Sequence, residues 1–478
     1  MRKTSTTERA SLLRWRDVYG EAELYKAAVR VYTKPVFQWR KALATSTDGR
    51  TLYDFAAHGL ARLNAMHAAL KSETFGFRPS VALHYNFNGK HRTLYIPPWE
   101  ERIVDLLLYR LLNRRLHNWF SPNSYAYRER KYSLDTCQTR IAGILRSTRS
   151  PLYVVKRDIS DYFASIDHEV LLNKLASMMD PGDFLYRLLV QRVRFLFEEG
   201  GNLQMATVGI PFGTSIACLL ANIYLTELDR EIENVPGVSY FRYADDLLLL
   251  SPNREVAAQA AQHLELLLAQ LRLRTKASHR ADLLLTDAFA SDREFTIARN
   301  FRHLGLLFRA GGGVALSRDK LRKVQNLFRF AFRRKRRWKR QAGHLARAQA
   351  LVTIAAETIE KGIRNVAILD YYLKHVNNEA QLRLLDRWLA EEVLSAVFGG
   401  HKKGHFRRMS FQQLRAMGLP SLVHRRRMIL RGRMESPFFI WQREKATRAF
   451  RGTVARLCRS AGETAFSPFP EAAASKRP

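Results

Sequence analysis

The chain is poor in cysteine and has no long apolar run. Its three cysteines, Cys137, Cys218 and Cys458, are scattered and odd in number. They therefore exclude the disulfide framework of a small secreted domain and a cysteine-based zinc site. No run of eighteen or more apolar residues occurs, so no segment is expected to span a membrane. Residues 1–9 are polar and lack the apolar core of a signal peptide. We therefore expect a reduced, cytoplasmic protein without a membrane partner.

Acidic residues are also scarce relative to basic ones. The 478 residues include 79 Lys and Arg against 44 Asp and Glu, which gives a formal net charge of +35. Such an excess indicates a polyanionic partner, most commonly nucleic acid. Ribosomal and histone-like proteins share this charge, but 46% of this long chain is hydrophobic. The length and this apolar fraction together predict two to four domains or subdomains with their own cores.

Two adjacent carboxylates, Asp245 and Asp246, follow Tyr243-Ala244 and precede the apolar run Leu247–Leu250. This pattern predicts a tight turn between two buried strands. Partly buried like charges cost several kcal/mol unless a positive charge lies between them. A divalent cation meets that need, and carboxylate oxygens favour Mg²⁺ or Mn²⁺. The alternative is a solvated turn in which Asp serves only as a turn former.

A third carboxylate, Asp158, ends the β-rich segment 151–157. Three carboxylates from two strand ends can hold two cations roughly 3.5–4 Å apart, which activates an attacking oxygen and stabilises a leaving one in phosphoryl transfer. A strand that ends in Asp is common by itself. The two segments together, in this order, favour a metal site over a solvated turn.

Further motifs extend this pair of segments in a fixed order. They are Arg157–His168, Gly209–Gly213 running into Leu219–Leu225, Tyr243–Asp246, and Phe301–Gly305. In this order they resemble the palm motifs of prokaryotic reverse transcriptases, the broad group of group II intron, retron and phage-defence enzymes. Upstream, Ile96-Pro97, 101–104 and 121–128 resemble the finger motifs of the same family.

The resemblance implies an α+β protein with right-hand polymerase architecture. Its parts are fingers, a palm with a small antiparallel sheet, and a helical thumb. Helical N- and C-terminal extensions are expected on either side. The expected ranges are 1–80 for a helical N-terminal extension, 81–150 for the fingers, 151–315 for the palm, 316–395 for the thumb, and 396–478 for a basic region that binds RNA.

The resemblance also implies an RNA-directed DNA polymerase that adds dNTPs by two-metal nucleotidyl transfer. Mg²⁺ is the expected cofactor, with Mn²⁺ as a substitute. Asp158, Asp245 and Asp246 would be the catalytic metal ligands, and the backbone carbonyl of Ile159 would complete one shell. The implied partners are dNTPs, an RNA template or dedicated non-coding RNA, and the DNA product. A homo-oligomer or a partner protein stays open.

Four cations are candidate contacts for the incoming nucleotide. Asn88-Gly89 predicts a hairpin tip, and Lys90 and Arg92 follow where the family's fingertips carry cations that face the triphosphate. Arg102 and Arg128 are further candidates by resemblance. Solvent-exposed charge is the alternative for each of them. Lys276 is a candidate general acid, whereas Asp167 is expected only to cap a helix.

Two aromatic residues are also candidate nucleotide contacts. Phe163, five positions past Asp158, falls where the family keeps a bulky side chain that excludes a 2′-hydroxyl. An ordinary core aromatic is the alternative. Phe212 replaces the Gln that the family usually has between Pro211 and Gly213. Phe can stack on a base but offers no amide hydrogen bonds, which leaves open how the template is held.

A strongly basic segment follows the expected palm. Residues 329–340 hold eight cations in twelve positions, interrupted by Phe330, Phe332 and Trp338. A solvated face is the usual interpretation of such a run. In a polymerase, however, the thumb follows the palm and grips duplex phosphates. The candidate nucleic-acid contacts are Arg333, Arg334, Lys335, Arg336, Arg337, Lys339 and Arg340.

Two other functions remain open from the sequence. One is template-independent or protein-primed DNA synthesis on the same fold. The other is an RNA-binding, maturase-like splicing factor, against which three retained carboxylates argue. Anti-phage defence is the favoured biological role because no intron-type endonuclease motif is apparent, with a retron or a diversity-generating system as alternatives.

Overall fold

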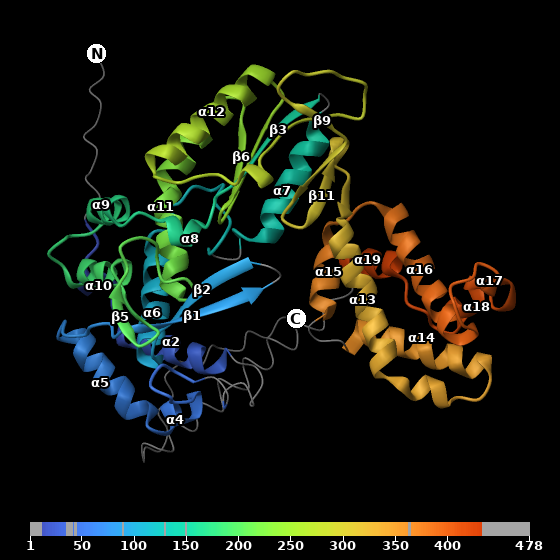
Figure 1. The fold of residues 1–478 in the computed structure, drawn as a ribbon, viewed down its shortest axis with the longest axis horizontal. Coiled ribbons are helices and arrows are strands. Elements are labelled where there is room, and N and C mark those ends of the chain that lie inside the picture. Colours follow the sequence, from blue (N-terminus) through green and yellow to red (C-terminus); the bar gives the residue numbers. More distant parts are fainter. Residues whose placement is uncertain are drawn as a thin grey trace, which may run out of the picture.

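We describe a computed structural model of the chain, which covers residues 12–34, 42, 45–87, 90–128, 131–148, 151–361 and 365–432. Figure 1 shows the N-terminal helices and a projecting hairpin in blue, a sheet with its covering helices in green and yellow, and a helical region in orange. None of the helices in these ranges has the length and apolar character needed to cross a bilayer.

The largest sheet of the described residues has five strands in the order β6-β7-β3-β8-β9. We call it the palm sheet; it is antiparallel except for the pairing of β8 with β9. Strands β6 and β7 form the hairpin expected around Ala244-Asp245, and β3 lies beside β7. Its strands are β3 (Leu152–Asp158), β6 (Ser239–Tyr243), β7 (Asp246–Ser251), β8 (Ala281–Leu285) and β9 (Thr296–Ala298).

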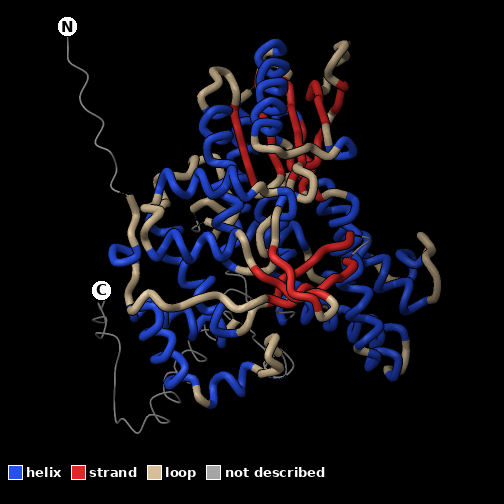
Figure 2. Tube along the Cα trace, turned by 60° about the vertical axis from the view of Figure 1, so that its left-hand side comes forward, coloured by secondary structure: helices blue, strands red, loops and turns tan. Residues whose placement is uncertain are grey.

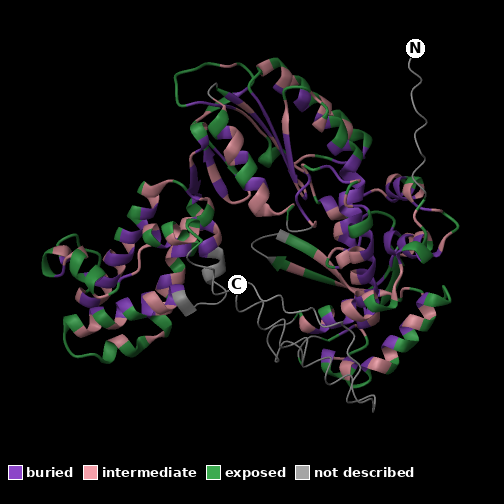
Figure 3. Cartoon of the chain, turned by 180° about the vertical axis from the view of Figure 1, so that it is seen from behind, coloured by how far each residue is buried: buried purple, intermediate pink, exposed green. Residues whose placement is uncertain are grey.

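Both faces of the palm sheet are buried, and this explains the unbroken apolar run in β7 (Figure 3). Leu247 and Leu249 enter one core, against α11 (Ser215–Glu233) and α12 (Arg254–Gln270). Leu248 and Leu250 enter a second core, which includes residues of α7 (Leu134–Ser147) and of the helical region beyond residue 317. Successive side chains of a strand point to opposite faces, so a strand covered on both sides needs apolar residues throughout.

A second sheet, in the order β2-β1-β4-β5, contains two strands from the range expected to form the fingers. Strands β1 (Ser80–Phe87) and β2 (Lys90–Ile96) form the predicted hairpin, with Phe87 paired to Lys90. The other two strands, β4 (Leu196–Glu199) and β5 (Asn202–Met205), come from inside the range expected to be palm. The parallel pairing of β1 with β4 thus joins distant segments that no local pattern in the sequence links. Figure 2 shows the strands gathered in separate groups.

The expected N-terminal helices pack on the fingers helix α6 (Trp99–Arg115). Trp15 donates from its indole Nε1 to the Leu70 carbonyl at 2.9 Å, and Arg110 of α6 contacts Glu23 at 3.2 Å. Buried apolar residues of these helices join the core on the α11 side of the palm sheet. The N-terminal elements are α1 (Trp15–Val18), α2 (Glu21–Thr33), α4 (Leu52–Ala57) and α5 (Gly59–Lys71).

A small sheet connects the palm to the helices that follow. It consists of β10 (Asn300–His303), β11 (Leu306–Arg309) and β12 (Val314–Leu316). Leu304 and Gly305 form the turn between β10 and β11, with φ of 48° and 85°. Two consecutive positive φ angles match the twist of a tight hairpin. Gln138 of α7 donates to the Leu304 carbonyl at 3.0 Å and fixes this turn against the body of the protein.

The chain beyond residue 317 forms one helical region, which we call the thumb. Helix α16 runs through the expected boundary at residue 396, and Arg425 of α19 makes a buried ion pair with Asp370 of α15. The described residues 396–432 therefore complete the thumb core instead of forming a separate basic region; residues 433–478 lie outside the described residues. The thumb elements are α13 (Arg318–Arg334), η3 (Arg336–Arg340), α14 (His344–Lys361), α15 (Asn365–His375), α16 (Glu379–Phe398), α17 (His405–Arg408), α18 (Phe411–Ala416) and α19 (Leu422–Leu430).

The buried pair allows a test of this integration. Asp370→Ala would leave the Arg425 guanidinium buried without its counter-charge, so we expect a loss of about 3–5 kcal/mol in the free energy of unfolding of the thumb. Urea denaturation followed by circular dichroism measures it. Glu379→Ala is the control, because Glu379 pairs with Arg383 and Arg427 at the surface and should cost less than about 1 kcal/mol. Equal losses in the two variants would contradict the packing described here.

Candidate functional site

The three predicted carboxylates meet at one end of the palm sheet. Asp158 is the last residue of β3 and lies directly opposite Asp246, the first residue of β7. Asp245 and Ala244 form the turn before β7, and Ala244 has a φ of 59°. The backbone N–H of Ile159 donates to the Asp245 carbonyl at 3.2 Å, which ties the end of β3 to the turn. Pairing across the strands thus brings together side chains that are distant in sequence.

A buried arginine supports the turn from below. Arg242 donates from Nε and Nη2 to the two oxygens of Asp229, both at 2.6 Å, and neither side chain is exposed. Tyr240 donates to the same carboxylate at 2.7 Å. The remaining nitrogen, Nη1, donates to Asn222 Oδ1 at 3.1 Å and to the Ala244 carbonyl at 3.3 Å. The guanidinium therefore connects α11 to the peptide that carries Asp245.

The same arginine joins the fingers to the palm through its backbone. Its N–H donates to the Asn123 carbonyl at 2.9 Å, and its carbonyl accepts from the Tyr125 N–H at 2.9 Å. Asn222 donates to the Ala126 carbonyl, also at 2.9 Å. The segment 121–128 is thus docked along the edge of β6 beside the turn.

Two lysines lie beside two of the three carboxylates. Lys276 Nζ lies 3.3 Å from Asp158 Oδ2, and its backbone N–H donates to the Asp158 carbonyl at 2.8 Å. Lys156 Nζ lies 3.6 Å from Asp246 Oδ1. Lys276 was a candidate from the sequence, whereas Lys156 was missed. Strand alternation could have found it, because Lys156 and Asp158 are two positions apart and share one face of β3.

Burial raises the pKa of the turn carboxylates. The pKa of Asp245 rises to about 6, mainly through burial and secondly through the negative charge of Asp158. The pKa of Asp246 is also raised by burial, with Lys156 opposing the shift. The site thus disfavours its own negative charge, as expected where carboxylates gather without full compensation.

These residues fit a divalent cation by their chemistry. Within the described ranges, no three His, Cys, Asp or Glu side chains are gathered closely enough to enclose an ion. The contacts explain this spacing, because Asp158 and Asp246 each face a separate lysine. Three carboxylates on adjoining strand ends are nevertheless hard oxygen donors, and a cation between them would relieve the repulsion that raises their pKa values. Asp158, Asp245 and Asp246 are therefore the residues that would hold Mg²⁺ or Mn²⁺, and the Ile159 carbonyl remains a predicted ligand.

The two aromatic candidates form a cluster that the fingers hairpin reaches. The Phe163 and Phe212 ring centroids are 5.0 Å apart, and Arg92 Cζ of β2 lies 5.7 Å from the Phe212 centroid. The ring centroid of Tyr127, which was not a candidate from the sequence, lies 6.2 Å from that of Phe163. The hairpin and the loop before α11 therefore bring together three of the six predicted nucleotide contacts. Lys90 pairs with Phe87 through its backbone, and its side chain lies outside the described residues.

A glycine permits the approach of this loop. Gly209 has a φ of 80°, and a Cβ there would lie 3.0 Å from the backbone of Ala164. Only glycine tolerates both conditions. The loop is further held by the Tyr95 N–H, which donates to the Phe212 carbonyl at 3.0 Å. The Gly209–Gly213 motif thus fixes the position of Phe212 against β2.

The other two cation candidates are engaged by the protein itself. Arg102 donates to the Pro97 carbonyl at 2.9 Å and stacks 4.2 Å from the Trp99 ring centroid. Arg128 donates to the carbonyls of residues 117, 121 and 124, and its Cζ lies 3.6 Å from the Tyr132 ring centroid. These contacts favour a structural role for both arginines over the predicted nucleotide contact.

The basic run predicted as a helix is split in the structure. Helix α13 ends at Arg334, and residues 336–340 form the short turn η3. Lys335 and Arg337 both pair with Glu357 of α14, at 2.6 and 3.0 Å. Those two cations therefore stabilise the thumb, whereas Arg333, Arg334, Arg336, Lys339 and Arg340 have no ion pair within the described residues.

Comparison with known families identifies the class of protein. Residues 84–305, which contain the fingers hairpin, the carboxylates and the Leu304-Gly305 turn, match the family model described as reverse transcriptase (RNA-dependent DNA polymerase). This part of the chain, 222 of the 478 residues, is therefore similar to reverse transcriptase domains. The relatives include a bacterial group II intron-encoded protein and a bacterial retron reverse transcriptase, which agrees with the resemblance to prokaryotic reverse transcriptases.

Three curated relatives illustrate the similarity. The protein YkfC of Escherichia coli is 25% identical over 36% of this chain and 54% of its own length. The group II intron-encoded protein LtrA of Lactococcus lactis is 26% identical over 39% of this chain and 30% of its own. A retron reverse transcriptase of Escherichia coli is 30% identical over 24% of this chain and 37% of its own. The matches to the first three curated relatives cover 20%, 24% and 54% of their lengths.

The raised pKa of Asp245 predicts a cost in stability. The pKa of Asp245 in the folded protein is about 6, against an ordinary 3.8. Protonated Asp245 therefore stabilises the fold fully below about pH 4, and this stabilisation is lost as the pH rises through 6. Asp245→Asn should therefore increase the free energy of unfolding at pH 8 in EDTA by on the order of 1–3 kcal/mol. Urea unfolding at pH 8 and pH 4 measures the effect.

Asp161→Asn provides the matched control, because Asp161 is exposed and has a φ of 40° that Asn also tolerates. It should change stability little at either pH. A gain for Asp245→Asn that is as large at pH 4 as at pH 8 would contradict the role of the carboxylate charge.

Proposed function

We propose that the chain is an RNA-directed DNA polymerase that adds dNTPs by metal-assisted nucleotidyl transfer. The observation that carries this proposal is the placement of Asp158 opposite Asp246, with Asp245 on the adjoining turn, inside a reverse transcriptase domain. Divalent cations, when bound, would lower the pKa of the primer 3′-hydroxyl and neutralise triphosphate charge. The three carboxylates are the residues that would hold them.

The protein's own cations would act beside these carboxylates. Lys276 Nζ lies 3.3 Å from Asp158 Oδ2. A lysine in that position can donate its proton to the leaving pyrophosphate oxygen, which is the role expected of a general acid. Lys156, at 3.6 Å from Asp246, holds that carboxylate in place before substrate binds. Arg92 on the fingers hairpin would contact the triphosphate by charge-assisted hydrogen bonds.

The aromatic cluster supports selection of deoxynucleotides. Phe163 lies on the short helix that follows Asp158 and packs between Tyr127 and Phe212. A ring supported on two sides cannot easily move away from a 2′-hydroxyl. We therefore infer that Phe163 is the steric gate of the polymerase.

Phe212 keeps a second candidate function open. Its ring packs with Phe163 and faces Arg92, where it can stack on a base but cannot read one by hydrogen bonding. Template-independent or protein-primed synthesis would use such a surface. Sequencing the DNA made by the purified protein, with and without its co-purified RNA, distinguishes the two: templated synthesis predicts a product complementary to that RNA.

A dedicated RNA partner is the finer part of the proposal. It is supported by the net charge of +35 and by similarity to intron-encoded and retron proteins. A role in anti-phage defence rests on the family resemblance, and phage plating on cells that carry the wild-type gene or a carboxylate variant tests it. Equal plating efficiency on both strains would reject that role.

The central test removes the turn carboxylates. Asp245→Asn combined with Asp246→Asn should reduce dNTP incorporation by more than about a thousandfold, because neutral amides are poor ligands for divalent cations. RNA binding should be unchanged, since the candidate binding residues lie on the thumb. Primer extension and filter binding measure the two properties. Asp287→Asn, an exposed carboxylate, is the control; retained synthesis in the double variant would reject the proposed site.

Substitution of the gate residue tests nucleotide selection. Phe163→Ala should lower the ratio of kcat/KM for dGTP over GTP by at least about tenfold, because the 2′-hydroxyl would no longer meet the ring. Single-nucleotide incorporation kinetics with both substrates measure the ratio. If both kcat/KM values fell together at an unchanged ratio, Phe163 would be a packing residue only.

A further inference from the structure

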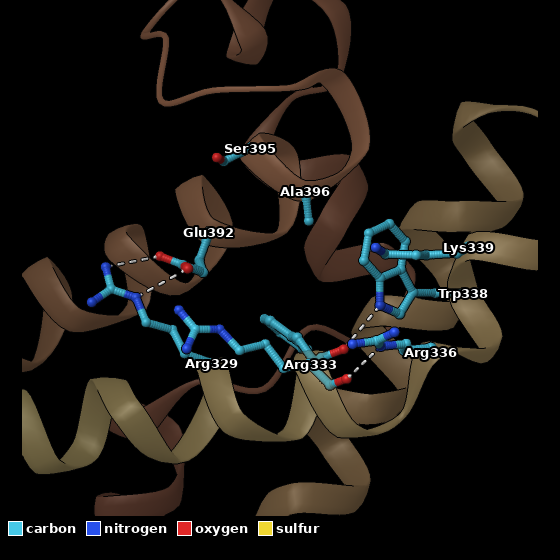
Figure 4. A pocket seen from close by; sticks show the side chains of 9 residues that line it. Arg329, Arg333, Arg336, Trp338, Lys339, Glu392, Ser395 and Ala396 are labelled. Atoms are coloured by element: carbon cyan, nitrogen blue, oxygen red, sulfur yellow. Dashed lines mark hydrogen bonds and ion pairs between the residues drawn. The ribbon is translucent and has the colours of Figure 1, made fainter.

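A pocket of about 310 Å³ opens between the end of α13, η3 and α16 in the thumb (Figure 4). Its volume is at the small end of ligand sites, which run from about 300 to 1,000 Å³. A single nucleotide fits such a volume, whereas a duplex does not. Its lining residues are Arg329, Phe332, Arg333, Arg336, Trp338, Lys339, Glu392, Ser395 and Ala396.

The charges that line this pocket are unbalanced. Four of the lining residues are cations, and only Glu392 is acidic. The Glu392 carboxylate accepts two hydrogen bonds from Arg329, at 3.0 and 3.2 Å. Arg333, Arg336 and Lys339 have no carboxylate partner within the described part of the chain. Three uncompensated cations around one concavity repel one another and attract an anion with several charges.

An aromatic ring is held rigidly between these cations. Trp338 donates from Nε1 to the Phe332 carbonyl at 3.1 Å and packs against the thumb core. Lys339 Nζ lies 5.6 Å from the centroid of this ring, and Arg336 donates to the Arg333 carbonyl at 3.4 Å. A fixed indole beside free cations is the combination that binds a base by stacking and its phosphates by charge.

The pocket lies at the end of α13 that is farther along the chain from the palm. Helix α13 begins just after β12 and has 17 residues, so its far end lies roughly 25 Å from that sheet at 1.5 Å per residue. We propose that this pocket binds one unpaired nucleotide of a single-stranded nucleic acid, with the base on Trp338 and the flanking phosphates on Arg333, Arg336 and Lys339. The inference deepens the proposed function, because it names a holding site for the strand before or after synthesis.

Binding of a labelled twelve-nucleotide single strand to the full chain, without dNTPs, tests the proposal. Trp338→Leu should weaken binding by about 5- to 100-fold, whereas Trp338→Phe, which keeps a stacking face, should stay within about threefold of the wild type. Arg333→Ala with Arg336→Ala should lower the slope of log affinity against log salt by about 1.4, which corresponds to two phosphates. Fluorescence anisotropy measures the affinity of each variant and its salt dependence. The same measurement with RNA and with DNA of one sequence distinguishes binding of the template from binding of the product strand.

Matched controls separate this pocket from the rest of the thumb. Phe330→Leu removes an exposed ring of α13 outside the lining, and Arg383→Ala removes a paired surface cation of α16; both should bind as the wild type does. A twelve-base-pair duplex should bind Trp338→Leu and the wild type equally. Equal single-strand affinity of Trp338→Leu and Trp338→Phe, or equal loss for duplex and single strand, would overturn the proposal.

The test is independent of polymerase activity. If the wild type incorporated no dNTP, the proposed function would fail, yet strand binding by the pocket would still be measured. If Trp338→Leu did not fold, as judged by circular dichroism, the arginine double variant would decide the outcome by its salt slope.

Discussion

The buried ion pair between Arg242 and Asp229 is the interaction on which the site depends. The Arg242 guanidinium binds α11 through Asp229 and Asn222, and the carboxylate turn through the Ala244 carbonyl. The Arg242 backbone binds the fingers segment 121–128. Removal of one partner of a buried ion pair lowers the free energy of unfolding by about 3–5 kcal/mol. A substitution at Arg242 or Asp229 would therefore disturb all of these contacts together. The pair thus fixes the turn relative to both the palm helices and the fingers.

That rigid support holds a site that is unfavourable by itself. Burial and mutual repulsion raise the pKa values of Asp245 and Asp246, and two lysines compensate only part of the charge. A protein that needed only a stable turn would gain by neutral residues there. Under the proposed function, bound divalent cations would supply the positive charge that these carboxylates lack and so offset this cost.

Some basic residues of the thumb form ion pairs that stabilise it, and others are left without such partners among the described residues. Lys335 and Arg337 are tied to Glu357, Arg329 to Glu392, and Arg425 is buried against Asp370. The cations left over surround Trp338 at the end of α13. A high net charge alone could not show which cations are free, because each carboxylate that pairs with the basic run comes from a distant helix.

The sequence by itself determined the carboxylate turn and several other local features. The Asp-Asp dipeptide before Leu247–Leu250, the hairpin of β1 with β2 and the Asp167 cap, which accepts the Val170 N–H at 3.0 Å, follow from local patterns, and each forms as predicted. The expected tip residues Asn88 and Gly89 lie outside the described residues. Only the tertiary structure decided that β4 joins the fingers sheet, that Arg102 and Arg128 are occupied by backbone carbonyls, and that residues 396–432 close the thumb core. Turns and caps depend on a few neighbouring residues, whereas strand pairing and the partners of a charged side chain depend on which distant segments the folded chain brings into contact.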